Sequence, residues 1–251
     1  MNIIKKITVL LTASFLIFMA GFGCKKDAPP PTPTPVPTPT IVPHDEKIVY
    51  TFNGALYQIE TDGKEKEELF PDSNSKWFPS VSPDGWYVAY WVFSGGAYNL
   101  WIGDFKKNIS YQITFDSAGL EASTHNITIN NSPSWTPDSE HIIYSRYGDI
   151  WKITRDGFNT EALTDTRNNI SPAVSANHRL IYSKIEGSAY NLYVRALYGK
   201  HDTQLTSYTG EKAVSSFFSP DGKTVVYNLI NKDTVNIYKF NIDSKTCLLY
   251  T

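Results

Sequence analysis

SPDGWYVAY (residues 82–90) and SPDGKTVVY (residues 219–227) open alike although they lie far apart in the chain. An aspartate between Pro and Gly suits a catalytic acid, a metal ligand or a turn residue. Pro sets φ, Asp bonds nearby backbone N–H groups and Gly adopts positive φ, which are the properties of a tight turn. Two related stretches, TPDSEHIIY (136–144) and VSANHRLIY (174–182), favour the turn, because copies spread around one fold do not converge on one substrate. We therefore expect five structural turn residues: Asp84, Gly85, Asp138, Asp221 and Gly222.

These stretches belong to a longer repeat with three landmarks. Each apolar run ends in a tyrosine: Tyr50, Tyr90, Tyr144, Tyr182 and Tyr227. An aromatic residue follows each of them: Tyr57, Trp101, Trp151, Tyr193 and Tyr238. At a fixed spacing beyond it comes a phenylalanine or a threonine: Phe70, Thr114, Thr164, Thr206 and Thr251. The chain therefore contains five repeat units.

Each unit supplies four short runs that are rich in Val, Ile, Tyr and Trp and are bounded by Gly, Pro, Asn or Asp, as is typical of strands. No sustained helical period occurs after residue 40. One small twisted sheet has two apolar faces and cannot cover both, so neighbouring units stack around an axis. We predict an all-β fold, a β-propeller of about five four-stranded blades over residues 40–251, whose ring closes by packing between its end blades or stays open. The expected blades span about 40–70, 77–114, 132–164, 170–206 and 214–251.

The repeats resemble the β-propeller repeats of the TolB family, which are WD40-like repeats with a Pro-Asp-Gly turn. The resemblance is carried by SPDG (82–85), TPDS (136–139) and SPDG (219–222), each followed by a strand that ends in Tyr. It implies the fold far more than the function, because TolB-like blades occur in binding proteins, peptidases and polysaccharide lyases. TolB itself joins an N-terminal α/β domain to six blades. Here we expect a lipoprotein leader and five blades instead, so a role in the Tol envelope system does not transfer with the repeat.

The N-terminus is typical of an export signal. Lys5 and Lys6 precede an apolar run over 7–22 and then Gly23-Cys24, so we predict a lipoprotein-type signal peptide over 1–23. GFGC resembles a lipobox whose Cys24 carries the lipid; ordinary cleavage and an uncleaved anchor are the alternatives. Residues 24–39 form a Pro/Thr-rich linker that favours extended polyproline II. We expect an exported, membrane-anchored lipoprotein that faces the periplasm or the cell exterior.

Composition and motifs argue against several classes of function. A net charge of −2 gives no overall attraction to nucleic acid. The five histidines show no metal-ligand spacing, and no nucleophile elbow, P-loop or dinucleotide fingerprint occurs. We therefore expect neither a metal nor a cofactor. If Cys24 is lipidated, Cys247 has no partner, and its apolar surroundings (CLLY) predict a small buried residue.

Residues that break the repeat are the better candidates for binding. Trp77, Phe78 and Trp91 have no aromatic counterparts in most units, and Tyr98 and Tyr190 lie in matching loops. Exposed aromatic rings suit a peptide or a sugar, and local packing is the alternative. An insertion over 115–131 lengthens one connection, as functional loops often do, or is simply tolerated. Its polar candidates are Glu121, His125 and Asn126.

Three functions remain open at this point. The first is a non-catalytic, envelope-anchored propeller that binds a protein or glycan partner and meets the membrane through a lipid anchor. The second is a carbohydrate-active hydrolase or lyase, whose catalytic acids come from distant blades. The third is a scaffold in an envelope complex.

Overall fold

The computed structural model describes residues 47–117 and 132–250, and the regular structure of these residues is entirely β. Blade 1 contains β1 (Lys47–Phe52), β2 (Ala55–Glu60) and β3 (Glu67–Leu69). Blade 2 contains β4 (Ser75–Val81), β5 (Tyr87–Ser94), β6 (Ala97–Asp104) and β7 (Ile109–Gln112). Blade 3 contains β8 (Ser134–Trp135), β9 (His141–Arg146), β10 (Asp149–Thr154) and β11 (Thr160–Ala162). Blade 4 contains β12 (Asn169–Val174), β13 (Arg179–Glu186), β14 (Ala189–Ala196) and β15 (Thr203–Gln204). Blade 5 contains β16 (Lys212–Phe218), β17 (Thr224–Asn231), β18 (Thr234–Asn241) and β19 (Thr246–Leu249).

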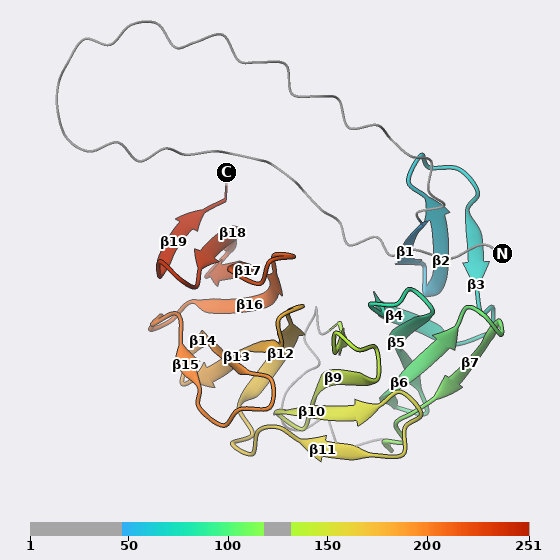
Figure 1. Ribbon diagram of the computed structural model, residues 1–251, viewed down its shortest axis with the longest axis horizontal. Helices are drawn as coiled ribbons and strands as arrows, with labels where there is room; N and C mark the ends of the chain where they lie inside the picture. The colour runs from blue at the N-terminus through green and yellow to red at the C-terminus, as the bar shows by residue number, and fades with distance from the viewer. Residues whose placement is uncertain (1–46, 118–131, 251) are drawn as a thin grey trace, which may run out of the picture.

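Each blade is an antiparallel meander in which consecutive strands pair, and the blades follow one another around an arc (Figure 1). The predicted all-β propeller is therefore confirmed. Blade 1 shows three strands, and the strand expected at 40–42 lies outside the described residues. Blades 4 and 5 are joined into one sheet by a parallel bridge between Tyr190 and Lys212. Within the described residues, no helix is long and apolar enough to cross a membrane.

The core consists of four clusters, one at each junction between consecutive blades. Strand β5 shows how the sequence builds them, because alternate side chains point to opposite faces of a strand. Val88 and Tyr90 join the cluster between blades 1 and 2, whereas Ala89 and Trp91 join the cluster between blades 2 and 3. A second strand that is buried on both faces therefore reads as an unbroken apolar run. Burial of both faces of this strand is the physical reason why the blades stack, as the repeat predicted.

The repeated aromatic residues are cross-strand pairs within each blade. Tyr227 lies opposite Tyr238, and Tyr182 lies opposite Tyr193. The ring centroids of these pairs stand 5.9 and 6.2 Å apart, with the rings stacked. The tyrosine on the second strand is almost fully buried in blades 2 to 5. Such pairs stabilise a sheet and hold its register.

In blades 2 to 4, the repeated threonine follows the outer strand and bonds back to the third strand. Thr206 Oγ1 accepts a hydrogen bond from the backbone N–H of Leu192 at 2.9 Å and donates one to Asn191 Oδ1 at 3.1 Å. The same oxygen of Asn191 accepts the N–H of Tyr208 at 2.7 Å, in the segment that leads to blade 5. Blades 2 and 3 repeat this arrangement around Thr114 and Thr164. The Asn or Asp near the start of the third strand is thus a buried polar link that recurs in these three blades.

The inner strands carry bulges that the sequence analysis did not anticipate. The register shifts between Trp77 and Ser80 in β4, and equivalent shifts occur in β12 and β16. Phe78, Ser171 and Ser215 adopt positive φ at these places. Because the deviation recurs in three blades, it belongs to the architecture, where a bulge bends and twists a strand.

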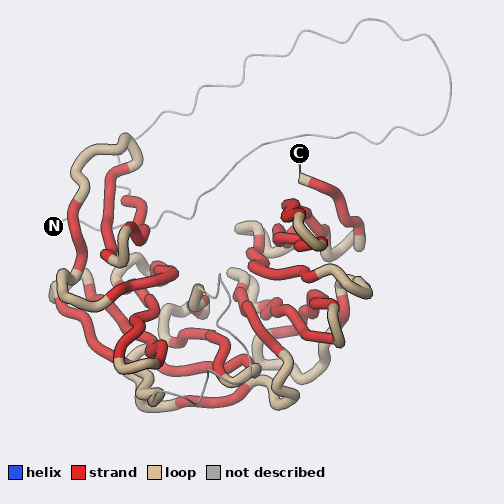
Figure 2. Tube along the Cα trace, turned by 180° about the vertical axis from the view of Figure 1, so that it is seen from behind, coloured by secondary structure: helices blue, strands red, loops and turns tan. Residues whose placement is uncertain are grey.

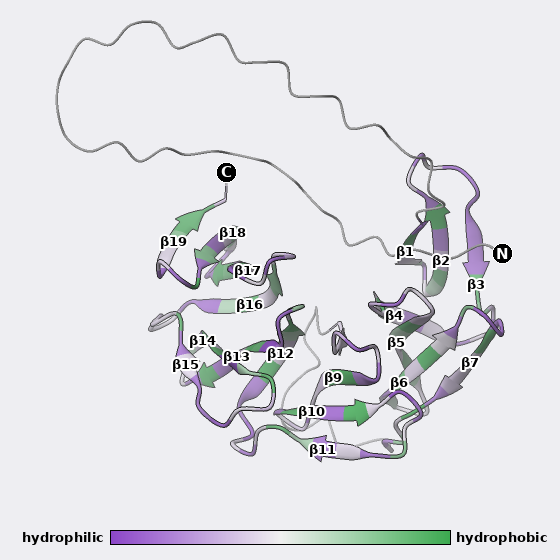
Figure 3. Cartoon of the chain, in the orientation of Figure 1, coloured by the Kyte–Doolittle hydropathy of each residue, from purple (hydrophilic) through white to green (hydrophobic). Residues whose placement is uncertain are grey.

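The arc is open between blades 1 and 5, which stand apart in both views (Figures 1 and 2). Blade 5 has no described neighbour on its outer face, so Val235 and Ile237 are exposed there, and β19 is exposed along its length although it is apolar (Figure 3). Cys247 lies on β19 as an exposed free thiol whose Sγ is 3.1 Å from the hydroxyl of Tyr227. The expectation that Cys247 is buried was wrong, because β19 is the outer edge strand of its blade, and the outer strands β11 and β15 are exposed in the same way.

Candidate functional site

Two pairs of aromatic side chains lie in blade 2, towards the end that carries the β5–β6 turn. Trp77 and Phe78 belong to the inner strand β4, with their ring centroids 6.4 Å apart. Phe93 is the penultimate residue of β5 and faces Tyr98 of β6, with their centroids 4.8 Å apart. Trp77 is 40% exposed and Phe93 is 48% exposed. We call these four residues the aromatic cluster; it presents apolar ring faces to solvent beside the inner strand.

The local sequence explains why these rings meet. Gly95 and Gly96 adopt φ values of 62° and 84°, which a two-residue hairpin turn of the favoured twist requires. The turn pairs Ser94 with Ala97, and the pair before it is therefore Phe93 and Tyr98. Directly opposite residues point to the same face of a sheet, so both rings lie on one side of blade 2.

A buried polar junction lies next to the aromatic cluster, at the start of the insertion. The backbone N–H of Asp116 donates to Asn99 Oδ1 at 2.7 Å, and its carbonyl accepts from Asn99 Nδ2 at 3.2 Å. The Asp116 carboxylate pairs with Arg146 and accepts the hydroxyl of Tyr147 at 2.8 Å. Only 4% of the Asp116 side chain is exposed. This junction fixes where the insertion leaves blade 2 and ties it to blade 3.

A cavity lies on the axis, at the end of the inner strands opposite the aromatic cluster. It has a volume of about 360 Å³ and is lined by the ends of four inner strands and the prolines of their turns. Trp135 Nε1 donates to the carbonyl of Ser80 at 2.8 Å, and Ser134 Oγ accepts the N–H of Val174 at 2.9 Å. These bonds hold neighbouring inner strands together. The lining has hydroxyl and apolar groups and no charged side chain, so this axial cavity suits an apolar group of a partner.

The repeated aspartates lie in the turns between the first and second strands. Asp138 Oδ1 accepts the Thr136 hydroxyl at 2.5 Å and the N–H of Glu140 at 3.0 Å. Equivalent bonds form at Asp84 and Asp221. The hydroxyl of Ser219, followed by a backbone N–H, holds the pKa of Asp221 below its usual value. Each carboxylate bonds to groups of its own turn, so the role of these aspartates is structural.

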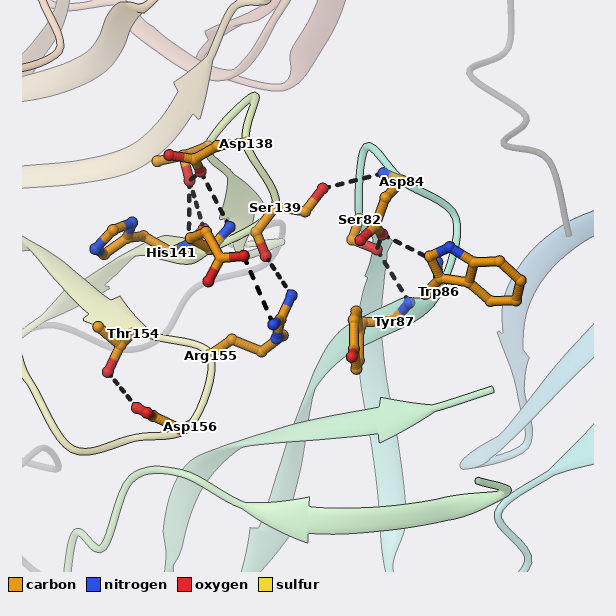
Figure 4. Close-up of polar contacts among 12 residues, drawn as sticks. Ser82, Asp84, Trp86, Tyr87, Asp138, Ser139, His141, Thr154, Arg155 and Asp156 are labelled. Carbon is orange, nitrogen blue, oxygen red and sulfur yellow. Dashed lines mark hydrogen bonds and ion pairs between the residues drawn. The ribbon is translucent and has the colours of Figure 1, made fainter. Parts of the chain in front are cut away.

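The turns also bond to one another across blades. Figure 4 shows Ser139 between two neighbours: its hydroxyl accepts the N–H of Asp84 at 3.0 Å and its carbonyl accepts Arg155 at 2.9 Å. Ser139 has a φ of 63°, where Gly85 and Gly222 have 75° and 67°. In the degraded fourth copy, Asn177 replaces the aspartate and still accepts the hydroxyl of the preceding Ser175 at 2.5 Å. The turn thus survives the loss of its usual Pro, Asp and Gly.

The other residues singled out from the sequence are dispersed. Trp91 is 4% exposed and packs edge-on against Tyr144 at 6.1 Å, so it belongs to the core between blades 2 and 3 and offers no surface to a ligand. Tyr190 lies in blade 4, far along the arc, beneath the Lys212 ammonium at 5.2 Å. Four residues lie outside the described residues: Cys24, Glu121, His125 and Asn126.

Sequence reasoning missed Phe93, the most exposed ring of the aromatic cluster. Its signal was its place directly before the glycine turn, opposite Tyr98. In the part of the chain that the structure describes, no three His, Cys, Asp or Glu side chains stand close enough to hold a metal ion.

Together, the stacked four-stranded sheets and the axial cavity define a β-propeller. The sequence matches curated TolB proteins: it is 26% identical over 223 residues to the Tol-Pal system protein TolB of Francisella tularensis subsp. holarctica, covering 78% of this chain and 49% of that protein. It is 30% identical over 118 residues to a TolB homolog of Chlorobaculum tepidum, covering 45% of this chain and 25% of that protein. No family model matches the sequence. The chain carries a propeller domain homologous to that of TolB, and it spans half the length or less of these relatives.

Solved structures show the same fold. TolB from Acinetobacter baumannii aligns with a TM-score of 0.64 at 16% identity, covering 78% of this chain and 48% of that chain. A TolB-related structure from Agrobacterium tumefaciens aligns with a TM-score of 0.66 at 15% identity, covering 81% and 76%. An oligogalacturonate lyase in complex with manganese aligns at 0.53 and 11% identity, covering 78% and 58%. Because this fold occurs in both binding proteins and enzymes, function has to be argued from the sites.

Proposed function

We propose that this protein is a non-catalytic binding module of the bacterial cell envelope, tethered through lipidated Cys24 and its Pro/Thr-rich linker, and that the aromatic cluster holds a protein partner. The observation that carries the proposal is the exposure of Trp77 and Phe93 on a rigid blade. Exposed aromatic anchors beside an ordered polar group are typical of protein-recognition hot spots. The homology to TolB, whose relatives are named for the Tol-Pal system, supports a location in the envelope.

The polar junction beside the cluster supports recognition better than catalysis. Asp116 is buried and already pairs with Arg146 and Tyr147, so its carboxylate is engaged in holding structure. The axial cavity, in turn, offers no acid or base in its lining. Binding is therefore the function that the geometry of the aromatic cluster and of the axial cavity supports best.

A glycan partner is the second candidate, because stacked, half-exposed rings such as Phe93 and Tyr98 also fit the apolar face of a sugar. Site-specific photocrosslinking in the native envelope separates the two. We expect a photoreactive residue at Phe93 to form a protease-sensitive adduct of defined mass, whereas the same residue at Phe158, which is 85% exposed on blade 3, forms none.

A polysaccharide adduct that resists protease would replace the protein partner with a glycan. Equal crosslinking at both positions would contradict binding at the aromatic cluster. Turnover of a peptide or polysaccharide that a single carboxylate substitution abolishes would overturn the non-catalytic assignment. Recovery of several proteins in one stable adduct would extend the proposal to a scaffold in an envelope complex.

A further inference from the structure

A second cavity opens between blades 4 and 5, away from the axis, with a volume of about 510 Å³. Its lining includes three basic side chains, Arg179, Arg195 and Lys245, and two imidazoles, His178 and His201. Among the residues that the structure describes, no Asp or Glu belongs to this lining, although the whole chain has a net charge of −2. We call this hollow the basic cavity; its local charge is opposite to that of the chain.

Two of the three basic groups remain uncompensated. Arg195 has an acidic neighbour, since its guanidinium stands 3.8 Å from Asp202 and also donates to the carbonyl of Leu163. Among the described residues, no ion pair includes Arg179 or Lys245. Gathering like charges without counter-charges is unfavourable unless an anion joins them.

The backbone holds these groups in place. Arg179 begins β13, where its N–H donates to Ser175 Oγ at 2.9 Å, and its guanidinium reaches the carbonyl of Gly222 in blade 5 at 3.4 Å. His178 and Lys245 occupy turns with φ values of 59° and 54°. The rim of the basic cavity therefore consists of turn residues from both blades, and the arginine already bridges them.

The floor of the basic cavity is apolar. Val194 and Leu205 come from blade 4, and Phe240 and Ile242 come from blade 5. Phe240 is 5% exposed and belongs to the core between these blades. A cationic rim above an apolar floor matches a ligand with an anionic group on one side and C–H groups on the other. A cavity of this volume has room for a sugar-sized molecule.

We propose that the basic cavity binds a small organic anion, a carboxylate or phosphate carried on a sugar-sized body, with the anionic group between Arg179 and Lys245. An arginine fork pairs with either anion, so the chemistry at the rim is shared. This site lies in another part of the arc from the aromatic cluster, and it stands or falls independently of the partner proposed there.

Calorimetric titration of the full 251-residue chain at low ionic strength tests the proposal with three probes of similar size: D-glucuronate, glucose 1-phosphate and D-glucose. We expect millimolar or tighter binding of at least one anion and none of glucose, with the affinity falling as salt screens the charges. A carboxylate source and a phosphate source are distinguished by which anion binds more tightly. Equal binding of glucose, or no binding of any probe, would overturn the proposal.

Two substitutions locate the site. Lys245→Asn retains a residue that tolerates positive φ, and Arg179→Gln removes the rim charge from blade 4. We expect each to weaken binding of the anion about tenfold. Lys232→Asn is the matched control, since Lys232 is also an exposed turn lysine of blade 5 with positive φ, but at the opposite end of the strands. Unchanged affinity in Lys245→Asn, which is exposed and not needed for packing, would refute the assignment even if Arg179→Gln failed to fold.

Discussion

Removal of the Thr206 hydroxyl is the clearest test of how the outer strand of blade 4 is held. Thr206→Val keeps the shape of the side chain and removes the group that accepts the N–H of Leu192 and donates to Asn191. Asn191 Oδ1 keeps its bond from Tyr208, so this acceptor remains satisfied. The N–H of Leu192 is left without an acceptor, because Leu192 is fully buried and has no access to water.

The magnitude follows from that single unpaired group. Leaving a buried donor unsatisfied costs about 1–3 kcal/mol. The additional buried methyl group of valine returns at most about 0.8 kcal/mol. These two bounds give a fall of about 0.2–3 kcal/mol in the free energy of unfolding, and we expect a value in the middle of that range, about 1–2 kcal/mol. With a urea dependence of about 2 kcal/mol/M, the unfolding midpoint should fall by about 0.5–1 M.

Urea unfolding followed by tryptophan fluorescence measures this shift. Thr160→Val is the matched control, because Thr160 is exposed on the outer strand β11 and should change the free energy of unfolding by less than about 0.5 kcal/mol. If Thr206→Val and Thr160→Val shifted the midpoint equally, the threonine would not be holding the outer strand, and the reasoning would be refuted.

Three further predictions address packing, pH dependence and binding. Gly103→Ala should destabilise the protein by about 1–3 kcal/mol in urea unfolding, because the new Cβ would lie 2.2 Å from Phe70 Cε2; an unchanged midpoint would contradict this packing. Burial raises the pKa of Tyr90 to about 12, so its contribution to the free energy of unfolding is complete below the pKa of about 10 in the unfolded chain and is lost as pH rises toward 12. Between about pH 9 and 11.5 the wild type should therefore lose more stability than Tyr90→Phe, and parallel losses would refute this. Phe93→Ala should weaken partner binding about tenfold while Phe158→Ala does not, as measured by a binding titration with the partner that crosslinking at Phe93 identifies.

The fold was predictable because each repeat contains the same turn residues and the same pairing of strands. The turn at Asp84 needs only a Pro, an Asp and a Gly in sequence, and its bonds reach residues two positions away. The aromatic pairs, such as Tyr227 with Tyr238, follow from strand register once the turn is known. Periodicity of this kind marks the core without any knowledge of distant contacts.

The candidate sites were only partly predictable. Trp77 stood out because it breaks the repeat and Tyr98 because it lies in one of two matching loops, yet Trp91 also breaks the repeat and is buried. These side chains all lie on the face of blade 2 that meets blade 3, so the difference is how far blade 3 covers that face, and this depends on how the two blades pack. Phe93 lies on the same face as Trp91 but beyond the edge of the neighbouring blade, so it is exposed.

The sequence by itself determined the blades: their strands, their turns and the residues that fill the junctions between them, because these depend on contacts within a repeat or between equivalent positions of neighbours. Only the tertiary structure decided where the series of blades leaves faces uncovered, and which unrelated turns meet. Val235 and Ile237 are exposed because blade 5 has no described neighbour on that face, and Arg179 and Lys245 share a cavity because two blades stack there. Such juxtapositions depend on the curvature of the whole arc, which no single repeat encodes.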